Sequence, residues 1–195
     1  MENAISALLG VDLESEGWKM ADAKGHSLDV LRNAISMEIE GKEFFEAAAQ
    51  KMKHPRAKEM FMSLVKQEQR HVDILQGELN RLSEGSGWAS LKEMMESRSS
   101  YPKISVFQDK AIKRFKMRPD AGELEVLNLG IEVEKKSMDY YRTAGNETAD
   151  PKAKEIFNWL VGEEGGHLTI LTAEYENRTK SGFYYDNMEF SLEVM

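Results

Sequence analysis

Six ionisable residues occupy positions at which an amphipathic helix would be buried. They interrupt apolar stripes that recur every three or four residues along four segments, and they are Glu38, Glu68, His71, Glu134, Glu164 and His167. Two of these segments carry the pattern Glu-x-x-His. Residues three apart share one face of a helix, so each pair can offer a carboxylate oxygen and an imidazole nitrogen to the same site.

Four buried carboxylates need compensation, because an unpaired one costs several kcal/mol and a whole domain is stable by only about 5–15 kcal/mol. Two divalent cations balance four carboxylates, and two neutral imidazoles complete the set. A lone Glu-x-x-His has a simpler interpretation as a solvated helix face, since glutamate is common in this chain. Two such pairs on apolar stripes, each with a partner glutamate on the preceding segment, favour a two-metal site.

The six residues belong to an internal repeat. Shifting the sequence by 96 positions aligns residues 28–79 with 124–175 without a gap, and about a third of the aligned positions are identical. The shift maps Glu38 onto Glu134 and places the first Glu-x-x-His pair on the second. Most other shared positions are apolar, so the two halves are expected to fold alike.

Each half is predicted to form a helix, a short turn and a second helix. The first helices run from about Leu28 to Met52 and from about Ala121 to Ala144, with Gly145 as a stop. The second helices start at Pro55 and Pro151, where proline suits the first helical position and Asp150 can cap the second of them, and they end near 82 and 179. Residues 83–120 form the crossover between the halves.

This organisation predicts an all-α fold, a four-helix bundle made of two antiparallel helix pairs joined by a long crossover. We assign residues 1–26 to an N-terminal extension, 27–180 to the bundle and 181–195 to a C-terminal tail. The tail contains aromatic residues that would suit a homodimer contact, namely Phe183, Tyr184, Tyr185 and Phe190.

The composition of the chain excludes several classes of partner and of metal site. The net charge of -8 argues against nucleic acid and anionic membranes as partners, and no apolar run is long enough to span a bilayer. The first residues lack the basic start of a signal peptide, so we expect a cytoplasmic protein. Because the chain has no cysteine, iron-sulfur clusters and thiolate sites are excluded and any metal is left to oxygen and imidazole ligands.

Several other ionisable residues fall off the apolar stripes and are interpreted as solvated charges: Glu40, Glu43, Glu132, Asp139 and Glu163. Two histidines, His26 and His54, lie outside the pattern or at a turn, and we expect no metal role for them.

The strings ISMEIEGKEFFEAAA, VKQEQRHVDIL, IEVEKKSMDYYRTAG and VGEEGGHLTIL resemble the rubrerythrin-like branch of the ferritin-like superfamily. The resemblance covers about residues 28–80 and 121–176. It implies two iron ions, with Glu38 and Glu134 as terminal ligands, Glu68 and Glu164 as bridging ligands, and one histidine on each metal, His71 or His167.

The sequence departs from that branch at three points. Tyr141 stands where a tyrosine often hydrogen-bonds near such centres, but its repeat counterpart is Phe45. Position 137 is Ser, where true rubrerythrins carry an additional glutamate. The cysteine-containing rubredoxin module is missing, so electrons would have to come from a separate donor protein.

The leading hypothesis is an oxidoreductase that reduces hydrogen peroxide or dioxygen at a di-iron centre, with Tyr141 as a catalytic hydrogen-bond or proton donor. Gly41 and Ser137 would leave room for the oxidant, although close helix packing explains them equally well. Alternatives are a ferroxidase that handles iron and a non-enzymatic metal-binding scaffold or sensor. Manganese could replace iron, since oxygen and imidazole ligands accept both.

Overall fold

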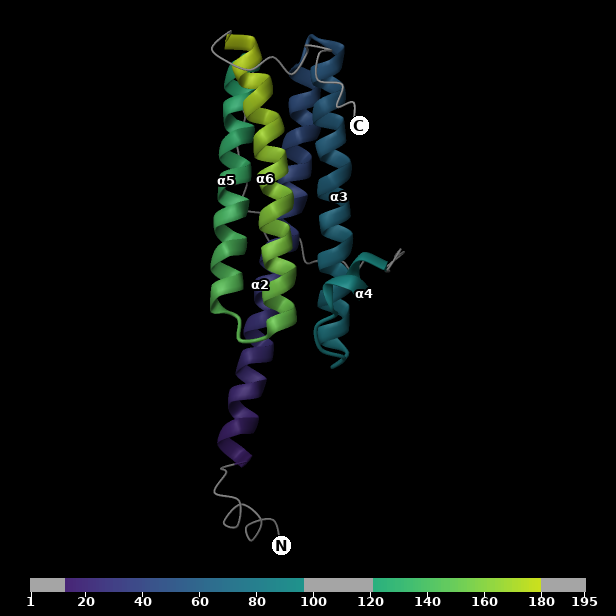
Figure 1. Ribbon diagram of the computed structural model, residues 1–195. Coiled ribbons are helices and arrows are strands. Elements are labelled where there is room, and N and C mark those ends of the chain that lie inside the picture. Colours follow the sequence, from purple (N-terminus) through teal and green to yellow (C-terminus); the bar gives the residue numbers. More distant parts are fainter. Residues whose placement is uncertain (1–12, 97–120, 180–195) are drawn as a thin grey trace, which may run out of the picture.

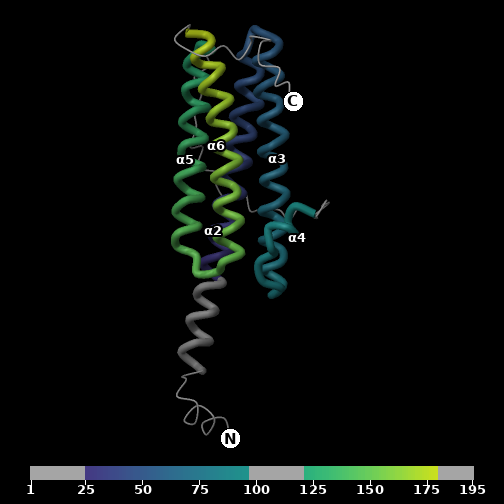
Figure 2. Tube along the Cα trace, viewed as in Figure 1, coloured from purple at the N-terminus to yellow at the C-terminus, as the bar shows by residue number. Residues whose placement is uncertain are grey.

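The computed structural model describes residues 13–96 and 121–179, with side chains from residue 25 onward (Figures 1 and 2). Within these ranges the chain is helical and contains no strand. The helices are α2 (Leu13–Lys51), α3 (Pro55–Ser83), α4 (Leu91–Glu96), α5 (Glu123–Glu147) and α6 (Pro151–Thr179). The predicted all-α four-helix bundle is thereby confirmed. The C-terminal tail and its aromatic residues lie outside the described residues.

Two helix hairpins form the bundle. α2 packs against α3 and α5 packs against α6, and the four long helices lie side by side (Figure 1). The crossover leaves α3 at residue 84, and its short helix α4 lies beside the end of that helix. Ser90 and Glu93 form a reciprocal capping box at the start of α4, with each side chain accepting a backbone N–H of the other residue.

Two predicted helix boundaries are wrong. α2 begins at Leu13 rather than near Leu28, because no proline interrupts the segment before it. α5 continues through Gly145 to Glu147. That glycine is buried, and a Cβ atom added to it would lie 3.5 Å from the Cβ of Phe157 on α6. Gly145 therefore lies inside α5 at its contact with α6 and does not stop the helix.

The two hairpins meet along two unequal seams. The backbones of α2 and α5 come close to each other at more places along their length than the backbones of α3 and α6 do. Glycines lie at the first seam, where a Cβ on Gly130 would be in ordinary contact with Phe45 at 3.5 Å and one on Gly41 with Val133 at 3.9 Å. Larger side chains, including Arg70 and Trp159, occupy the second seam.

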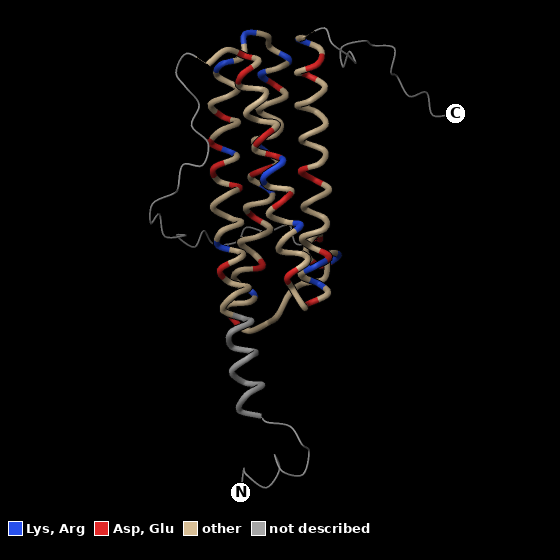
Figure 3. Tube along the Cα trace, turned by 90° about the vertical axis from the view of Figure 1, so that its left-hand side faces the viewer, with Lys and Arg blue, Asp and Glu red and all other residues tan. Residues whose placement is uncertain are grey.

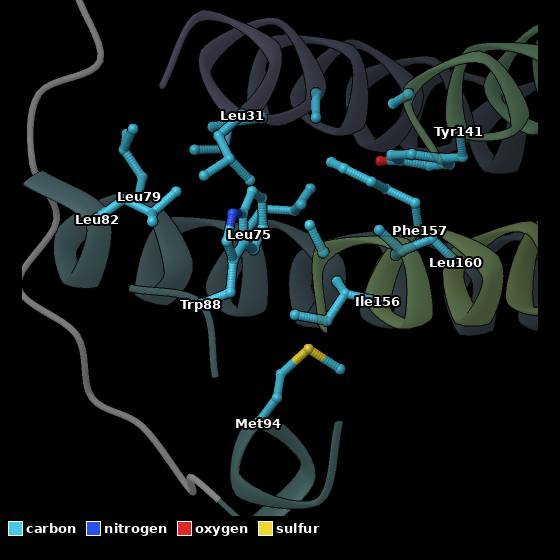
Figure 4. Close-up of a cluster of buried hydrophobic side chains, with 14 of the residues drawn as sticks. Leu31, Leu75, Leu79, Leu82, Trp88, Met94, Tyr141, Ile156, Phe157 and Leu160 are labelled. Atoms are coloured by element: carbon cyan, nitrogen blue, oxygen red, sulfur yellow. The ribbon is translucent and has the colours of Figure 1, made fainter. Parts of the chain in front are cut away.

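Two apolar layers flank the middle of the bundle. One is built around Phe45, Phe61, Leu64, Leu127 and Leu171. The other surrounds Leu75 and Phe157 and is closed by Trp88 and Met94 from the crossover (Figure 4). Each large side chain buried in these layers contributes roughly 1.5–3 kcal/mol, and together they keep water out of the section between them.

Acidic and basic residues are spread along the four long helices (Figure 3). Among the described residues, no helix is long and apolar enough to cross a membrane.

The two hairpin turns offer a matched test of helix capping. Asp150 accepts the backbone N–H of Lys152 at 2.8 Å and that of Ala153 at 3.3 Å, while its repeat counterpart His54 makes no side-chain cap on α3. We expect Asp150→Ala to lower the free energy of unfolding by about 1 kcal/mol, because two N–H groups lose their acceptor. His54→Asp should raise it by a similar amount. Urea denaturation of the metal-free protein measures both.

Asp150→Asn serves as the control, since asparagine also caps helices and should cost much less than alanine. Equal losses for Ala and Asn would show that the capping hydrogen bonds do not account for the effect.

Candidate metal centre

All four long helices send polar side chains into the section between the apolar layers. The six residues singled out by their spacing meet there: Glu38 from α2, Glu68 and His71 from α3, Glu134 from α5, and Glu164 and His167 from α6. Each is at most 3% exposed. The i, i+3 spacing on α3 and α6 stacks each glutamate one turn from its histidine, on the face that points to the bundle axis.

The six side chains form two overlapping groups. One consists of Glu38, Glu68, His71 and Glu164, and the other of Glu68, Glu134, Glu164 and His167. Within each group, one ligand atom from every residue lies within 4.8 Å of the others. Glu68 and Glu164 belong to both groups, so their carboxylates stand between two adjacent positions for a cation.

Both histidines turn the same ring nitrogen toward the carboxylates. Nδ1 of His71 lies 3.2 Å from Glu38 and 3.2 Å from Glu164. Nδ1 of His167 lies 3.1 Å from Glu164 and 3.2 Å from Glu68. The two rings are stacked, with centroids 5.5 Å apart. Each Nδ1 is therefore placed to act as one imidazole ligand of one group.

The donor set fits a pair of cations. Both oxygens of Glu164, one oxygen of Glu134 and both nitrogens of His167 are buried without a hydrogen-bond partner. Nδ1 of His167 is close to Glu164 in distance, yet it is not aligned for a hydrogen bond. Unpartnered buried polar atoms cost free energy, and metal coordination would satisfy all of those that face the centre.

Burial and neighbouring charges shift the pKa of every group in the centre. Burial, reinforced by the other carboxylates, raises the pKa of Glu38 and Glu134 well above the ordinary value. Burial also opposes ionisation of Glu68 and Glu164, but contacts from the histidines and neighbouring carboxyls outweigh it and lower both pKa values. The same contacts overcome the burial of the imidazoles, raising the pKa of His167 to about 12.

The pKa of His71 is likewise raised well above its ordinary value, by carboxylates that outweigh its burial. These shifts all favour retention of protons on the imidazoles and on Glu38 and Glu134, which lowers the buried negative charge of the metal-free cluster. Four carboxylates, two neutral imidazoles and two divalent cations would be neutral. Cations would therefore displace protons when they bind.

Tyr141 lies against one side of the centre. Its hydroxyl donates a hydrogen bond to Oε1 of Glu38, and the side chain is fully buried. Burial, followed by the charge of Glu38, raises the pKa of Tyr141 well above its ordinary value, so the hydroxyl keeps its proton. Phe45 occupies the repeat-related position and has no such donor. Correspondingly, Oε1 of Glu134 has no hydrogen-bond partner.

Most of the off-stripe charges are exposed as predicted, with two exceptions. Glu40 is only 9% exposed, because α2 contacts both α3 and α5 and its buried arc is wider than one stripe. The Glu163 side chain is 29% exposed, and its Oε2 lies 3.9 Å from Nε2 of His71. Contact with His71, partly offset by burial, lowers the pKa of Glu163. The position of Glu163 in the sequence did not indicate that it lies beside His71, since periodicity does not tell which flank of α6 faces α3.

His26 and His54 are exposed and belong to neither group. His54 instead lines a surface hollow at one end of the bundle, together with Glu174 and Arg178. The charge of Arg178 is already paired with Glu123 and Glu174. None of the residues that line the hollow belongs to the buried centre.

A four-helix bundle with two shared glutamates, two further glutamates and two histidines at its centre is a ferritin-like carboxylate bundle. Within this class, the chain belongs to the rubrerythrin family, whose pattern it matches over residues 29–175. No curated protein matches the chain.

Three solved structures are similar to this chain. The dodecameric thioferritin of Bacteroides fragilis, a bacterioferritin-related protein, has a TM-score of 0.59 at 19% identity, covering 80% of this chain and 88% of that one. A hypothetical protein from Pyrococcus furiosus has a TM-score of 0.56 at 20% identity, covering 81% of this chain and 93% of that one. The third is a two-domain protein of Anabaena variabilis with DJ-1/ThiJ/PfpI-like and ferritin-like domains. Its TM-score is 0.59 at 20% identity, covering 92% of this chain and 49% of that one. These likenesses show the fold.

Metal binding should release protons. His167, with its pKa raised to about 12, holds a proton at pH 7 that must leave before Nδ1 binds a cation, and the raised pKa values of His71, Glu38 and Glu134 act in the same direction. Affinity for Mn²⁺ should therefore rise as the pH is raised from 6 to 8. Calorimetric titration in two buffers of different ionisation enthalpy counts the protons, and binding without release would contradict this charge assignment.

Proposed function

We propose that this protein is a di-iron oxidoreductase that reduces hydrogen peroxide or dioxygen. The observation that carries the proposal is the pair of overlapping groups, in which Glu68 and Glu164 stand between two positions and each position has its own glutamate and histidine. Two iron ions held by these residues would supply one electron each to a two-electron acceptor. Manganese remains an alternative metal.

The side chains around the centre support this chemistry. Apolar layers on both sides exclude water, which strengthens every electrostatic interaction between them. Tyr141 holds Glu38 in place through a hydrogen bond from its hydroxyl, and this hydroxyl is the group that we propose as the proton donor to the oxidant.

Small residues leave space beside the shared carboxylates. A Cβ atom on Gly41 would lie 3.9 Å from the carboxyl carbon of Glu68, so the glycine keeps that side of the carboxylate free of side chain. Ser137, the repeat counterpart of Gly41, is also buried and small. We propose a separate electron-donor protein as the reductant of the oxidised centre, since these 195 residues contain no cysteine with which to bind a rubredoxin-type iron.

A ferroxidase that handles iron is the second candidate, supported by the similarity in fold to a protein described as a thioferritin. It predicts repeated Fe²⁺ oxidation with deposited iron beyond the two ions of the centre. A metal-binding scaffold or sensor predicts bound metal without consumption of an oxidant.

Elemental analysis followed by anaerobic reduction and stopped-flow mixing with peroxide, or with air, separates the three functions. Near two irons per chain and fast reoxidation by peroxide would support the proposed oxidoreductase. Oxidation of many Fe²⁺ equivalents per chain would favour the ferroxidase, and metal without oxidant reactivity would favour the scaffold.

Removing both shared carboxylates should abolish two-metal binding. We expect Glu68→Ala combined with Glu164→Ala to retain less than one metal per chain, because each position loses two of its four ligands. The matched control combines Glu59→Ala with Glu155→Ala, which removes two exposed, repeat-related glutamates from the same two helices. Two tightly bound metals in the Glu68/Glu164 variant would contradict the ligand assignment.

Tyr141→Phe tests the proton donor. The variant should bind two metals and reoxidise at least about 100-fold more slowly with peroxide, as is typical when a positioned acid is lost. Stopped-flow absorbance measures the rate. Phe45→Tyr is a counterpart that adds a hydroxyl at the repeat-related position. An unchanged rate in Tyr141→Phe would assign that side chain to the core alone.

A further inference from the structure

The two halves of the centre share the same ligands but differ in what surrounds them. Three side chains lie around the outer side of the His71 ring. Glu163 places a carboxylate oxygen 3.9 Å from Nε2 of His71, and the ring of Trp159 packs edge-on against the imidazole with centroids 5.8 Å apart. Arg70 stacks over Trp159 at 5.5 Å and contacts Glu163 at 3.5 Å. This cluster of Arg70, Trp159 and Glu163 is called the His71 brace below.

The repeat provides no equivalent brace for His167. A shift of 96 positions maps Glu163 onto Gln67, Trp159 onto Ser63 and Arg70 onto Gly166. All three replacements are neutral or lack a side chain that could brace a ring. Nε2 has no hydrogen-bond partner in either histidine, but among the described residues only Nε2 of His71 has a carboxylate oxygen within 4 Å. Gly166 has open space around its Cα, since an added Cβ would meet nothing within 4 Å.

A carboxylate behind a metal-binding histidine changes how well that histidine binds. It accepts the N–H of the outer nitrogen, which fixes the tautomer, orients the ring and makes the inner nitrogen a stronger donor. The 3.9 Å separation of Glu163 and His71 is about 1 Å longer than a hydrogen bond, a gap that side-chain rotation can close. Gln67 is neutral, so even in contact it would strengthen His167 less.

We propose that the two metal positions are unequal and that the position formed by Glu38 and His71 binds a divalent cation more tightly and fills first. Glu163 is the positioning residue responsible, acting through His71, while Arg70 and Trp159 hold it and the ring in place. The inference rests on the two-metal centre proposed above, and it adds an order of loading that the ligand set alone does not contain.

Titration with Co²⁺ tests the proposal, because the absorbance of bound Co²⁺ reports occupancy without any enzymatic turnover. The wild-type protein should bind two Co²⁺ ions in two steps of unequal affinity. Glu163→Gln should weaken the tighter step by about 10–100-fold and leave the weaker step unchanged. Gln67→Glu should tighten the weaker step by a similar factor, bringing the two steps together.

Single histidine variants assign the steps. His167→Ala should keep the tighter step, whereas His71→Ala should remove it. Glu155→Gln, an exposed glutamate on the same helix as Glu163, controls for a general loss of charge, and thermal unfolding of each variant controls for its fold.

Equal affinities in the wild-type protein, or a Glu163→Gln variant in which both steps move together or neither moves, would overturn the proposal. Failure to bind Co²⁺ at all would overturn the two-metal centre with it. Ordered binding of two Co²⁺ ions in a protein whose iron form does not react with peroxide would overturn the proposed activity and support the order of loading.

Discussion

The structure depends on the burial of four carboxylates and two imidazoles, each at most 3% exposed, in the middle section of the bundle. Such a cluster can exist only if its charge is cancelled within a few ångströms, because ionised groups lose most of their solvation there. Raised pKa values at Glu38, Glu134 and both histidines favour bound protons, which reduce the negative charge of the metal-free cluster. Two divalent cations could balance four carboxylates in their place.

The apolar layers stabilise the bundle, and the polar section between them holds the candidate metal ligands. Phe45, Leu64 and Leu171 on one side, and Leu75 and Phe157 on the other, supply the burial that holds the helices together. Because these layers supply the stability, the section between them can hold polar side chains whose hydrogen-bonding atoms are not all paired with one another. Unpartnered atoms on Glu134, Glu164 and His167 are the local cost of that arrangement.

The repeated sequence gives a centre whose six candidate ligands are symmetric and whose surroundings are not. Tyr141 hydrogen-bonds Glu38, whereas Phe45 leaves Glu134 without an equivalent donor. The His71 brace and Tyr141 both lie beside the same metal position, the one formed by Glu38 and His71. The contacts of α2 with α5 and of α3 with α6 are also unequal. The repeat places the same six residue types in both halves of the centre, and the side chains around them differ in size and charge.

The sequence by itself determined the helices, their pairing and the six inward-facing residues, because a 3.6-residue period and a repeat shifted by 96 positions are local properties of the chain. It could not place Glu163 beside His71 or Gly145 against Phe157, and it misjudged Glu40 as solvated. Those contacts depend on which flank of one helix faces another and on how closely the helices approach. Side chains from all four helices set both quantities jointly, so only the tertiary structure decided them.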